Sequence, residues 1–272
     1  MNWLQTIAVR KKEEVAERKR TSDFCWLREQ AQNLVKVAPN RGFLSAIKRK
    51  ETGPIRLIAE LKVRSPVKGQ FVASEKKEEI LESYERSPAA AISVLTDFPF
   101  FGGDLSDLAL AKEKTSKPVL RKDFIIDPFQ VYEARVAGAD ALLLIVALLS
   151  VEQLKDLLAL SNDLKMDCLV EVHDEKEAEV AQKTGAVCIG INNRDLTTFQ
   201  VDLNRTAQVM QSIDKGKIIV AESGIESREQ VVFLEDLGVD ALLVGEALVR
   251  DGNPLRKIRE LLGLDEDKGT GQ

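Results

Sequence analysis

The chain has 272 residues, of which 44% are hydrophobic, so it can bury a full core, and we expect one large domain. Lysine and arginine total 39 against 44 for aspartate and glutamate. The net charge of -5 argues against broad binding to nucleic acid or to an anionic membrane, so an anionic ligand must be held by local groups.

Few residues are available for metal or disulfide chemistry. Three cysteines, Cys25, Cys168 and Cys188, lack CxxC spacing, which favours a reducing, cytoplasmic location. The only histidine, His173, stands near no Cys/His cluster, so we expect no metal site. The segment MNWLQTIAVRKKEEVAERKR has acidic residues and no long apolar core, unlike a signal peptide, and no apolar run reaches the ~18 residues of a membrane span.

Residues 1–50 are predicted to form a helical extension of the main domain. The stretch from Gln5 to Arg20 is rich in charge and helix formers, and Thr21-Ser22-Asp23 offers N-cap chemistry for a second helix toward Val37. A third, short helix is expected from Phe43 to Arg49. Because both signs alternate in RKKEEVAERKR, we interpret this run as a solvated helix face rather than a binding patch.

From Ile55 onward, short aliphatic runs alternate with longer segments of helical pattern. Eight strands are predicted, at Ile55–Leu61, Ala90–Leu95, Pro118–Arg121, Ala141–Val146, Cys168–Val172, Val187–Ile191, Ile218–Ala221 and Ala241–Val244. Helices are predicted between them, among others at Lys76–Glu85, Pro128–Ala137, Val151–Leu160, Glu175–Thr184, Ser227–Leu237 and Pro254–Leu262. Three of these helices turn into the next strand through a glycine, at Gly138, Gly185 and Gly238.

Eight such units predict a closed parallel (β/α)8 TIM barrel over residues 51–264, with a doubly wound open sheet as the alternative. The first strand-to-helix turn has no GxGxxG, which weakens the open-sheet reading. Polar residues also follow many different strands, as a ring of strand ends around one mouth requires. The polar, glycine-rich segment 265–272 is expected to be a disordered tail.

Charged side chains stand where the apolar strands end. In the first strand Ile58, Glu60 and Lys62 share one face, because strand side chains alternate with a period of two. The same rule predicts one cavity lined from five strands by Glu60, Lys62, Lys122, Glu171, Asn192, Arg194 and Glu222. Simple ion pairing at solvent-facing positions is the alternative for any one of them, and the agreement of five strands argues against it.

Two glycine-containing turns are candidates for a phosphate site. Glu222-Ser223-Gly224 follows the seventh strand and Gly245-Glu246 follows the eighth, and glycine lets backbone N–H groups approach oxygen closely. Each glycine alone is also compatible with an ordinary turn. Ser65, after the first strand, offers a hydroxyl donor. His173 precedes Asp174 and Glu175, which favours a helix-entry or loop role over catalysis.

Over about residues 55–262, the sequence resembles the indole-3-glycerol-phosphate synthase family of tryptophan biosynthesis. The matching stretches are IAELKVRSPVKG, SVLTDFPFFGGDL, PVLRKDF, ALLLIVALL, CLVEVHDEKE, IGINNRDL, VAESGI and LVGEALVR. The resemblance implies a carboxy-lyase that closes the ring of 1-(2-carboxyphenylamino)-1-deoxyribulose 5-phosphate, with loss of carbon dioxide and water and without a cofactor. It implies a phosphorylated small-molecule substrate and leaves open whether other tryptophan-pathway enzymes are partners.

The resemblance also implies residue roles. Lys62 would bind the substrate carboxylate and is an alternative acid, Lys122 would be the general acid, and Glu171 the general base. Catalytic or substrate-orienting positions are matched by Glu60, Asn192, Arg194, Glu222 and Ser223. The phosphate site is matched by Ser65, Gly224, Gly245 and the backbone of Glu246, and the aromatic ring would lie between Phe101 and Phe124. Val63 and Val67 depart from the family, which commonly has a basic residue and a serine there.

Two other functions remain open from sequence. A phosphoribosylanthranilate isomerase would need an aspartate and a cysteine at strand ends, whereas Cys168 and Cys188 begin strands. A non-catalytic sensor of a sugar phosphate would account for the glycine turns. It would not account for two lysines and three glutamates that converge on one mouth.

Overall fold

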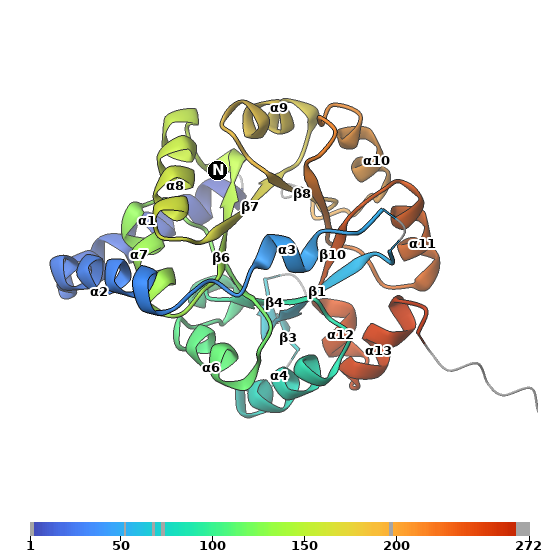
Figure 1. Ribbon diagram of the computed structural model, residues 1–272, viewed down its shortest axis with the longest axis horizontal. Helices are drawn as coiled ribbons and strands as arrows, with labels where there is room; N and C mark the ends of the chain where they lie inside the picture. Colours follow the sequence, from blue (N-terminus) through green and yellow to red (C-terminus); the bar gives the residue numbers. More distant parts are fainter. Residues whose placement is uncertain (1–2, 52, 67–68, 72–73, 196–197, 265–272) are drawn as a thin grey trace, which may run out of the picture.

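The computed structural model describes residues 3–51, 53–66, 69–71, 74–195 and 198–264. Eight parallel strands close into a barrel in which each strand pairs with its neighbours in chain order and the last pairs with the first (Figure 1). The barrel strands are β1 (Arg56–Leu61), β4 (Ala91–Leu95), β5 (Val119–Lys122), β6 (Ala141–Ile145), β7 (Asp167–Val172), β8 (Cys188–Asn192), β9 (Ile218–Glu222) and β10 (Ala241–Val244). The predicted TIM barrel is confirmed, and every strand boundary lies within one residue of its prediction.

Helices form the outer ring around the barrel (Figure 1). They are α4 (Lys77–Arg86), α6 (Ser106–Lys114), α7 (Pro128–Val136), α8 (Val151–Asp163), α9 (Glu175–Lys183), α10 (Asn204–Met210), α11 (Arg228–Asp236) and α13 (Pro254–Leu261). Helices α6 and α10 were not among those predicted. The glycines at the helix-to-strand turns, such as Gly138 with a φ of 91°, adopt the left-handed conformation that favours glycine.

Shorter elements lie in the loops after the strands. They are the antiparallel pair β2 (Arg64–Ser65) and β3 (Gly69–Gln70), the helices α5 (Phe98–Phe101) and α12 (Glu246–Arg250), and the 3-10 turns η1 (Ser74–Lys76) and η2 (Val146–Leu148). None of these elements was predicted from the sequence, because runs of two to five residues carry too little periodicity.

Two apolar cores hold the barrel together. One lies between the strands and the outer helices, and the other fills the barrel interior with residues such as Ile58, Leu120 and Leu169. Helix α3 (Phe43–Ile47) lies across one opening of the barrel (Figure 1), where Phe43 and Ile47 are fully buried against the interior core. This packing closes the amino-terminal end of the barrel, so a ligand site can open only at the carboxyl end.

The first two helices of the extension, α1 (Trp3–Thr21) and α2 (Phe24–Val37), both pack against the outer helix α7. The predicted N-cap of α2 is confirmed, since the Asp23 side chain accepts a hydrogen bond from the Trp26 backbone N–H. The interpretation of RKKEEVAERKR as a solvated face is wrong at one position. Lys11 is only 1% exposed, because α1 packs this side against acidic groups of the barrel.

None of the helices in the described ranges is long and apolar enough to cross a membrane. The predicted tail, residues 265–272, and Val67 lie outside the described residues.

Candidate active site

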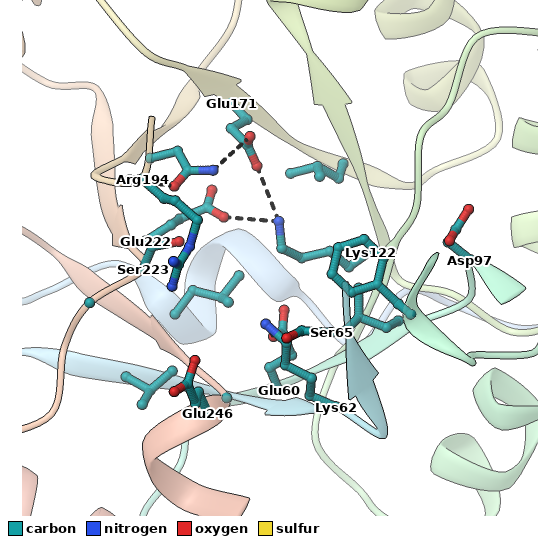
Figure 2. Close-up of a pocket in the computed structure, with 18 of the residues that line it drawn as sticks. Glu60, Lys62, Ser65, Asp97, Lys122, Glu171, Arg194, Glu222, Ser223 and Glu246 are labelled. Atoms are coloured by element: carbon teal, nitrogen blue, oxygen red, sulfur yellow. Dashed lines mark hydrogen bonds and ion pairs between the residues drawn. The ribbon is translucent and has the colours of Figure 1, made fainter. Parts of the chain in front are cut away.

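Every site residue that the sequence singled out lines one cavity at the carboxyl end of the barrel. They come from the ends of β1, β5, β7, β8 and β9 and from the segments that follow β1, β4, β5, β8, β9 and β10 (Figure 2). The faces also agree with the prediction: Leu120 points into the interior core two residues before Lys122, and Leu169 does so two residues before Glu171. The alternation of side chains along each strand therefore correctly predicted that the charged residues face the cavity. Their chemical roles remain predictions.

Lys122 lies at the centre of the charged cluster. Figure 2 shows its side chain between two glutamates, with Nζ 3.1 Å from Glu171 Oε2 and 3.0 Å from Glu222 Oε2. The Asn192 side-chain amide donates to the other oxygen of Glu171 at 3.0 Å. Both carboxylates are nearly inaccessible to solvent, so their charges act on one another through a medium of low dielectric constant.

The environment moves the pKa values of the two glutamates apart. Burial would raise the pKa of Glu171, but Lys122, His173 and the Asn192 hydrogen bond lower it below its ordinary value. Burial and the neighbouring charge of Glu171 raise the pKa of Glu222 to about 7, although Lys122 opposes the rise. Near neutral pH, Glu171 is therefore ionised and able to accept a proton, while Glu222 is partly protonated.

The pKa of Lys122 is raised above its ordinary value. Burial lowers it, but the charges of Glu171, Glu222 and Glu60 outweigh burial. Lys122 thus carries its proton in the free protein, and the same raised pKa makes it a weaker acid than an ordinary lysine.

Glycine in β8 makes room for one of these carboxylates. A Cβ built on Gly190 would lie 2.2 Å from Glu222 Oε1 and 3.2 Å from Leu169 Cδ1. Any side chain at Gly190 would therefore displace Glu222 from its place beside Lys122. The need for this glycine could not be read from the sequence, because the approach of β9 to β8 is a tertiary contact.

The second lysine lies near the aromatic part of the cavity. Lys62 Nζ is 3.6 Å from Glu60 Oε1 and 5.7 Å from the centre of the Phe101 ring, and the Phe101 and Phe124 rings lie 6.1 Å apart. A cation beside two rings suits a ligand that joins an aromatic ring to a carboxylate.

The departure at Val63 has a structural counterpart. Val63 is buried, and the next residue, Arg64, donates from its guanidinium to the backbone carbonyls of Phe98 and Pro99 at 2.8 Å each. Arg64 thereby ties the loop after β1 to α5, the short helix that carries Phe101. The basic residue shifted by one position therefore supports the wall of the cavity.

The loop after β9 is strained at the cavity. Ser223 has a φ of 67°, which is costly for a residue with a side chain, and Gly224 follows with a φ of 77°. A Cβ on Gly224 would lie 2.0 Å from Val201 Cγ1, and one on Gly245 would lie 2.6 Å from Glu60 Oε1. Both glycines thus permit close packing of backbone at the cavity wall, which is more than an ordinary turn requires.

Arg194 is anchored beside the same loop. Its backbone N–H donates to Asn192 Oδ1 at 3.0 Å, and its guanidinium donates to the Phe199 carbonyl at 3.2 Å. These bonds orient Arg194 toward the side of the cavity that Glu222 and Ser223 line (Figure 2).

His173 has both a structural contact and a contact with the site. Its backbone N–H donates to Glu177 Oε2 at 2.8 Å at the entry to α9, in line with the predicted helix-entry role. Its ring Nδ1 also lies 3.1 Å from Glu177 Oε2, and Nε2 lies 3.5 Å from Glu171 Oε1. Burial opposes the charged ring, but the two glutamates raise the pKa of His173.

Several cavity residues were missed by the sequence analysis. Trp3 and Ile7 of α1 and Phe199 of the loop after β8 line the cavity, and the Trp3 ring lies 5.8 Å from that of Phe199. None of these three residues lies on a barrel strand, so strand alternation could not find them. The aromatic residue at the start of an extension helix was the only signal. No group of three or more His, Cys, Asp or Glu in the described part of the chain is arranged to hold a metal ion.

The pKa of Glu222 predicts a pH effect on stability. Because it is about 7 in the folded protein against an ordinary 4.5, the folded state binds more protons between these values and loses stability as pH rises through the window. The loss is of the order of 3 kcal/mol at ~1.4 kcal/mol per unit. Glu222→Gln cannot take up this proton, so its free energy of unfolding is expected to fall less than that of the wild type from pH 5 to pH 7.5. Urea titrations of both proteins at pH 5 and pH 7.5 measure this change in the free energy of unfolding. An equal fall in the wild type and in Glu222→Gln would contradict the raised pKa of Glu222.

Comparison with known proteins decides the family. The family model of indole-3-glycerol phosphate synthase matches residues 4–261. The chain belongs to the indole-3-glycerol phosphate synthase family. It is 49% identical over 211 residues to the indole-3-glycerol phosphate synthase of Acetivibrio thermocellus, covering 78% of this chain and 81% of that protein. It is 44% identical over 263 residues to that of Polynucleobacter necessarius, covering 96% and 98%.

Solved structures of similar fold are more distant. A mutant tryptophan synthase alpha-subunit from Pyrococcus furiosus matches with a TM-score of 0.59 at 16% sequence identity. The match covers 76% of this chain and 98% of that subunit. The 3-hexulose-6-phosphate synthase of Salmonella typhimurium has a TM-score of 0.58 at 16% identity, covering 77% and 98%. At this identity the likeness supports the fold alone.

Proposed function

We propose that this chain catalyses the carboxy-lyase reaction of its family, the conversion of 1-(2-carboxyphenylamino)-1-deoxyribulose 5-phosphate to indole-3-glycerol phosphate. The observation that carries the proposal is Lys122, held by Glu171 and Glu222 in a cavity that two phenylalanines and a second lysine also line. Family membership over residues 4–261 supports it. The absence of a cofactor requirement and the cytoplasmic location remain predictions.

The proposed roles follow the chemistry of the substrate. Attack of the aromatic ring carbon on the substrate carbonyl forms the new C–C bond, and Lys122 gives a proton to the carbonyl oxygen. The carboxylate on that carbon, held by Lys62, then leaves as carbon dioxide, and its bonding electrons restore the aromatic ring. In the last step Lys62, the alternative acid, gives a proton to the hydroxyl, which leaves as water, while Glu171 takes up a proton from the neighbouring substrate carbon and the new double bond forms.

The substrate phosphate is assigned to the side of the cavity formed after β1, β9 and β10. Ser65, Gly224, Gly245 and the backbone of Glu246 line this side, and the close packing at both glycines leaves backbone rather than side chain facing the cavity. A dianionic phosphate bound away from the reacting atoms supplies binding energy that positions the ring and the carbonyl.

Purified protein mixed with the carboxyphenylamino deoxyribulose phosphate tests the function directly. The expected result is a rise of indole absorbance that saturates with substrate concentration. A protein that binds the substrate without turnover would instead support the sugar-phosphate sensor.

Gly224→Ala tests the phosphate assignment. The new methyl group would meet Val201 and strain a φ of 77°, so the loop must move from the cavity. We expect KM to rise about tenfold with a smaller change in kcat, measured by initial rates. Gly185→Ala is the matched control, because Gly185 has a φ of 92° but nothing within 4 Å of its Cβ position. An unchanged KM in Gly224→Ala would show that the substrate phosphate does not bind at this loop.

A further inference from the structure

Lys11 of α1 is a buried cation outside the group of proposed catalytic residues. Its side chain is 1% exposed, and its Nζ lies 2.8 Å from Asp97 Oδ1, 2.9 Å from Asp123 Oδ1 and 2.9 Å from Glu14 Oε2. An ammonium group is costly to bury unless charged partners compensate for the lost water. This cation therefore binds α1 specifically to two carboxylates at the carboxyl end of the barrel.

Asp97 lies in the loop after β4 and lines the cavity (Figure 2). Its second oxygen, Oδ2, accepts a hydrogen bond from the Phe100 backbone N–H at 2.9 Å and so caps α5. Phe101 is the last residue of this helix and lines the cavity. Asp97 thus holds the start of the short helix that carries the Phe101 ring.

Asp123 directly follows Lys122. Its Oδ1, which contacts Lys11, also accepts from the Phe124 backbone N–H at 2.8 Å. Its Oδ2 accepts from Thr96 Oγ1 at 2.7 Å and from the Arg121 guanidinium at 2.9 Å. Asp123 therefore joins the Phe124 backbone to the side chains of Thr96 and Arg121. It lies in the chain between the proposed acid and one of the two aromatic rings.

The two carboxylates repel one another unless a cation lies between them. Asp123 has Arg121 as a second cation at 2.9 Å, whereas Lys11 is the only cation paired with Asp97 among the described residues. Loss of the Lys11 charge would leave Asp97 buried and uncompensated beside Asp123, and the loops after β4 and β5 would move apart.

We propose that Lys11 is a positioning residue for the active site: its ammonium joins the loops after β4 and β5 and so sets Lys122 and Phe124 at the correct spacing from Phe101. Lys11 is assigned no contact with the substrate. The expected kinetic effect of Lys11 rests on the proposed function, whereas the tryptophan emission of Trp3 tests the same role independently of turnover.

Lys11→Met is the direct test. Misplacement of reacting groups by about an ångström costs up to a hundredfold, so we expect kcat/KM to fall about ten- to a hundredfold, with a large part of the fall in kcat. Lys19→Met is the matched control, since Lys19 also joins α1 to the barrel through an ion pair, with Asp127 at 3.0 Å, and neither residue lines the cavity. It is expected to lower the unfolding temperature but to leave kcat and KM within about twofold.

The double variant Lys11→Met/Asp97→Asn separates positioning from general stability. Asparagine still caps a helix, and with its charge removed no uncompensated carboxylate remains. Kinetic constants within about fivefold of wild type are expected. If Lys11→Met does not fold, the double variant alone tests the positioning role of Lys11. Near-wild-type kinetic constants in the double variant support that role, and an inactive or unfolded double variant overturns it.

Tryptophan emission gives a readout independent of catalysis. The chain has two tryptophans, and Trp26→Phe leaves only Trp3, whose ring lies 5.1 Å from that of Phe100 in α5. In this background Lys11→Met is expected to shift the emission to longer wavelength, and the added Asp97→Asn to reverse the shift. Unchanged kcat and KM in Lys11→Met, or a double variant no better than the single one, would overturn the inference. A wild type without synthase activity would refute the proposed function, and the emission series would still test the role of Lys11.

Discussion

Lys122→Met is expected to lower kcat by roughly a hundredfold or more while KM changes little, the usual scale for loss of a general acid. The structure gives the reason: Lys122 is held between Glu171 and Glu222, and their charges keep it protonated. Methionine preserves the length of the side chain and removes the proton donor. Substrate affinity should persist, because the proposed phosphate contacts lie in other loops.

Lys77→Met is a suitable control for the loss of a half-buried lysine. The Lys77 side chain is 13% exposed, close to the 15% of Lys122, and its Nζ lies 2.7 Å from Asp107 in the outer helices. It should leave kcat unchanged. A single-turnover experiment with carboxyl-labelled substrate then identifies the step at which Lys122→Met stops, because carbon dioxide leaves only after ring closure. Release of labelled carbon dioxide from Lys122→Met at the wild-type rate would exclude Lys122 as the acid for ring closure and would favour Lys62.

Glu171→Gln is expected to lower kcat by a similar factor but to stop the reaction later. The pKa of Glu171 is lowered, so its carboxylate is ionised and can accept a proton during dehydration. Glutamine keeps the shape and an oxygen for hydrogen bonding, but it cannot take up the proton. The variant should therefore release labelled carbon dioxide in a single turnover without the matching rise of indole absorbance.

The control for Glu171→Gln is Glu235→Gln in α11. Glu235 Oε1 accepts from the Ile55 backbone N–H at 3.0 Å at the opposite end of the barrel. Normal turnover in this control excludes a general effect of losing a carboxylate. If Glu171→Gln released no carbon dioxide, Glu171 would act before decarboxylation, and Glu222 would become the candidate base for dehydration.

Most of the barrel was predictable because its strands carry a simple pattern. β6, with the sequence ALLLI, is buried along its whole length, as a strand covered on both sides must be. At strand ends, a charge two residues after an interior leucine, as at Lys122 and Glu171, located the cavity. Trp3 carried no such signal, because the docking of α1 on the barrel depends on contacts between distant segments.

By itself, the sequence determined the eight strands, the face on which each charge lies and the end of the barrel where the charges gather, since these follow from local periodicity. Only the tertiary structure decided how the charges act on one another. The pKa of Lys122 rises because two glutamates from other strands lie about as close as hydrogen bonding allows, and Lys11 is buried because α1 packs against Asp97 and Asp123. Electrostatic energies depend on distance and burial, and both are set by segments far apart in the chain.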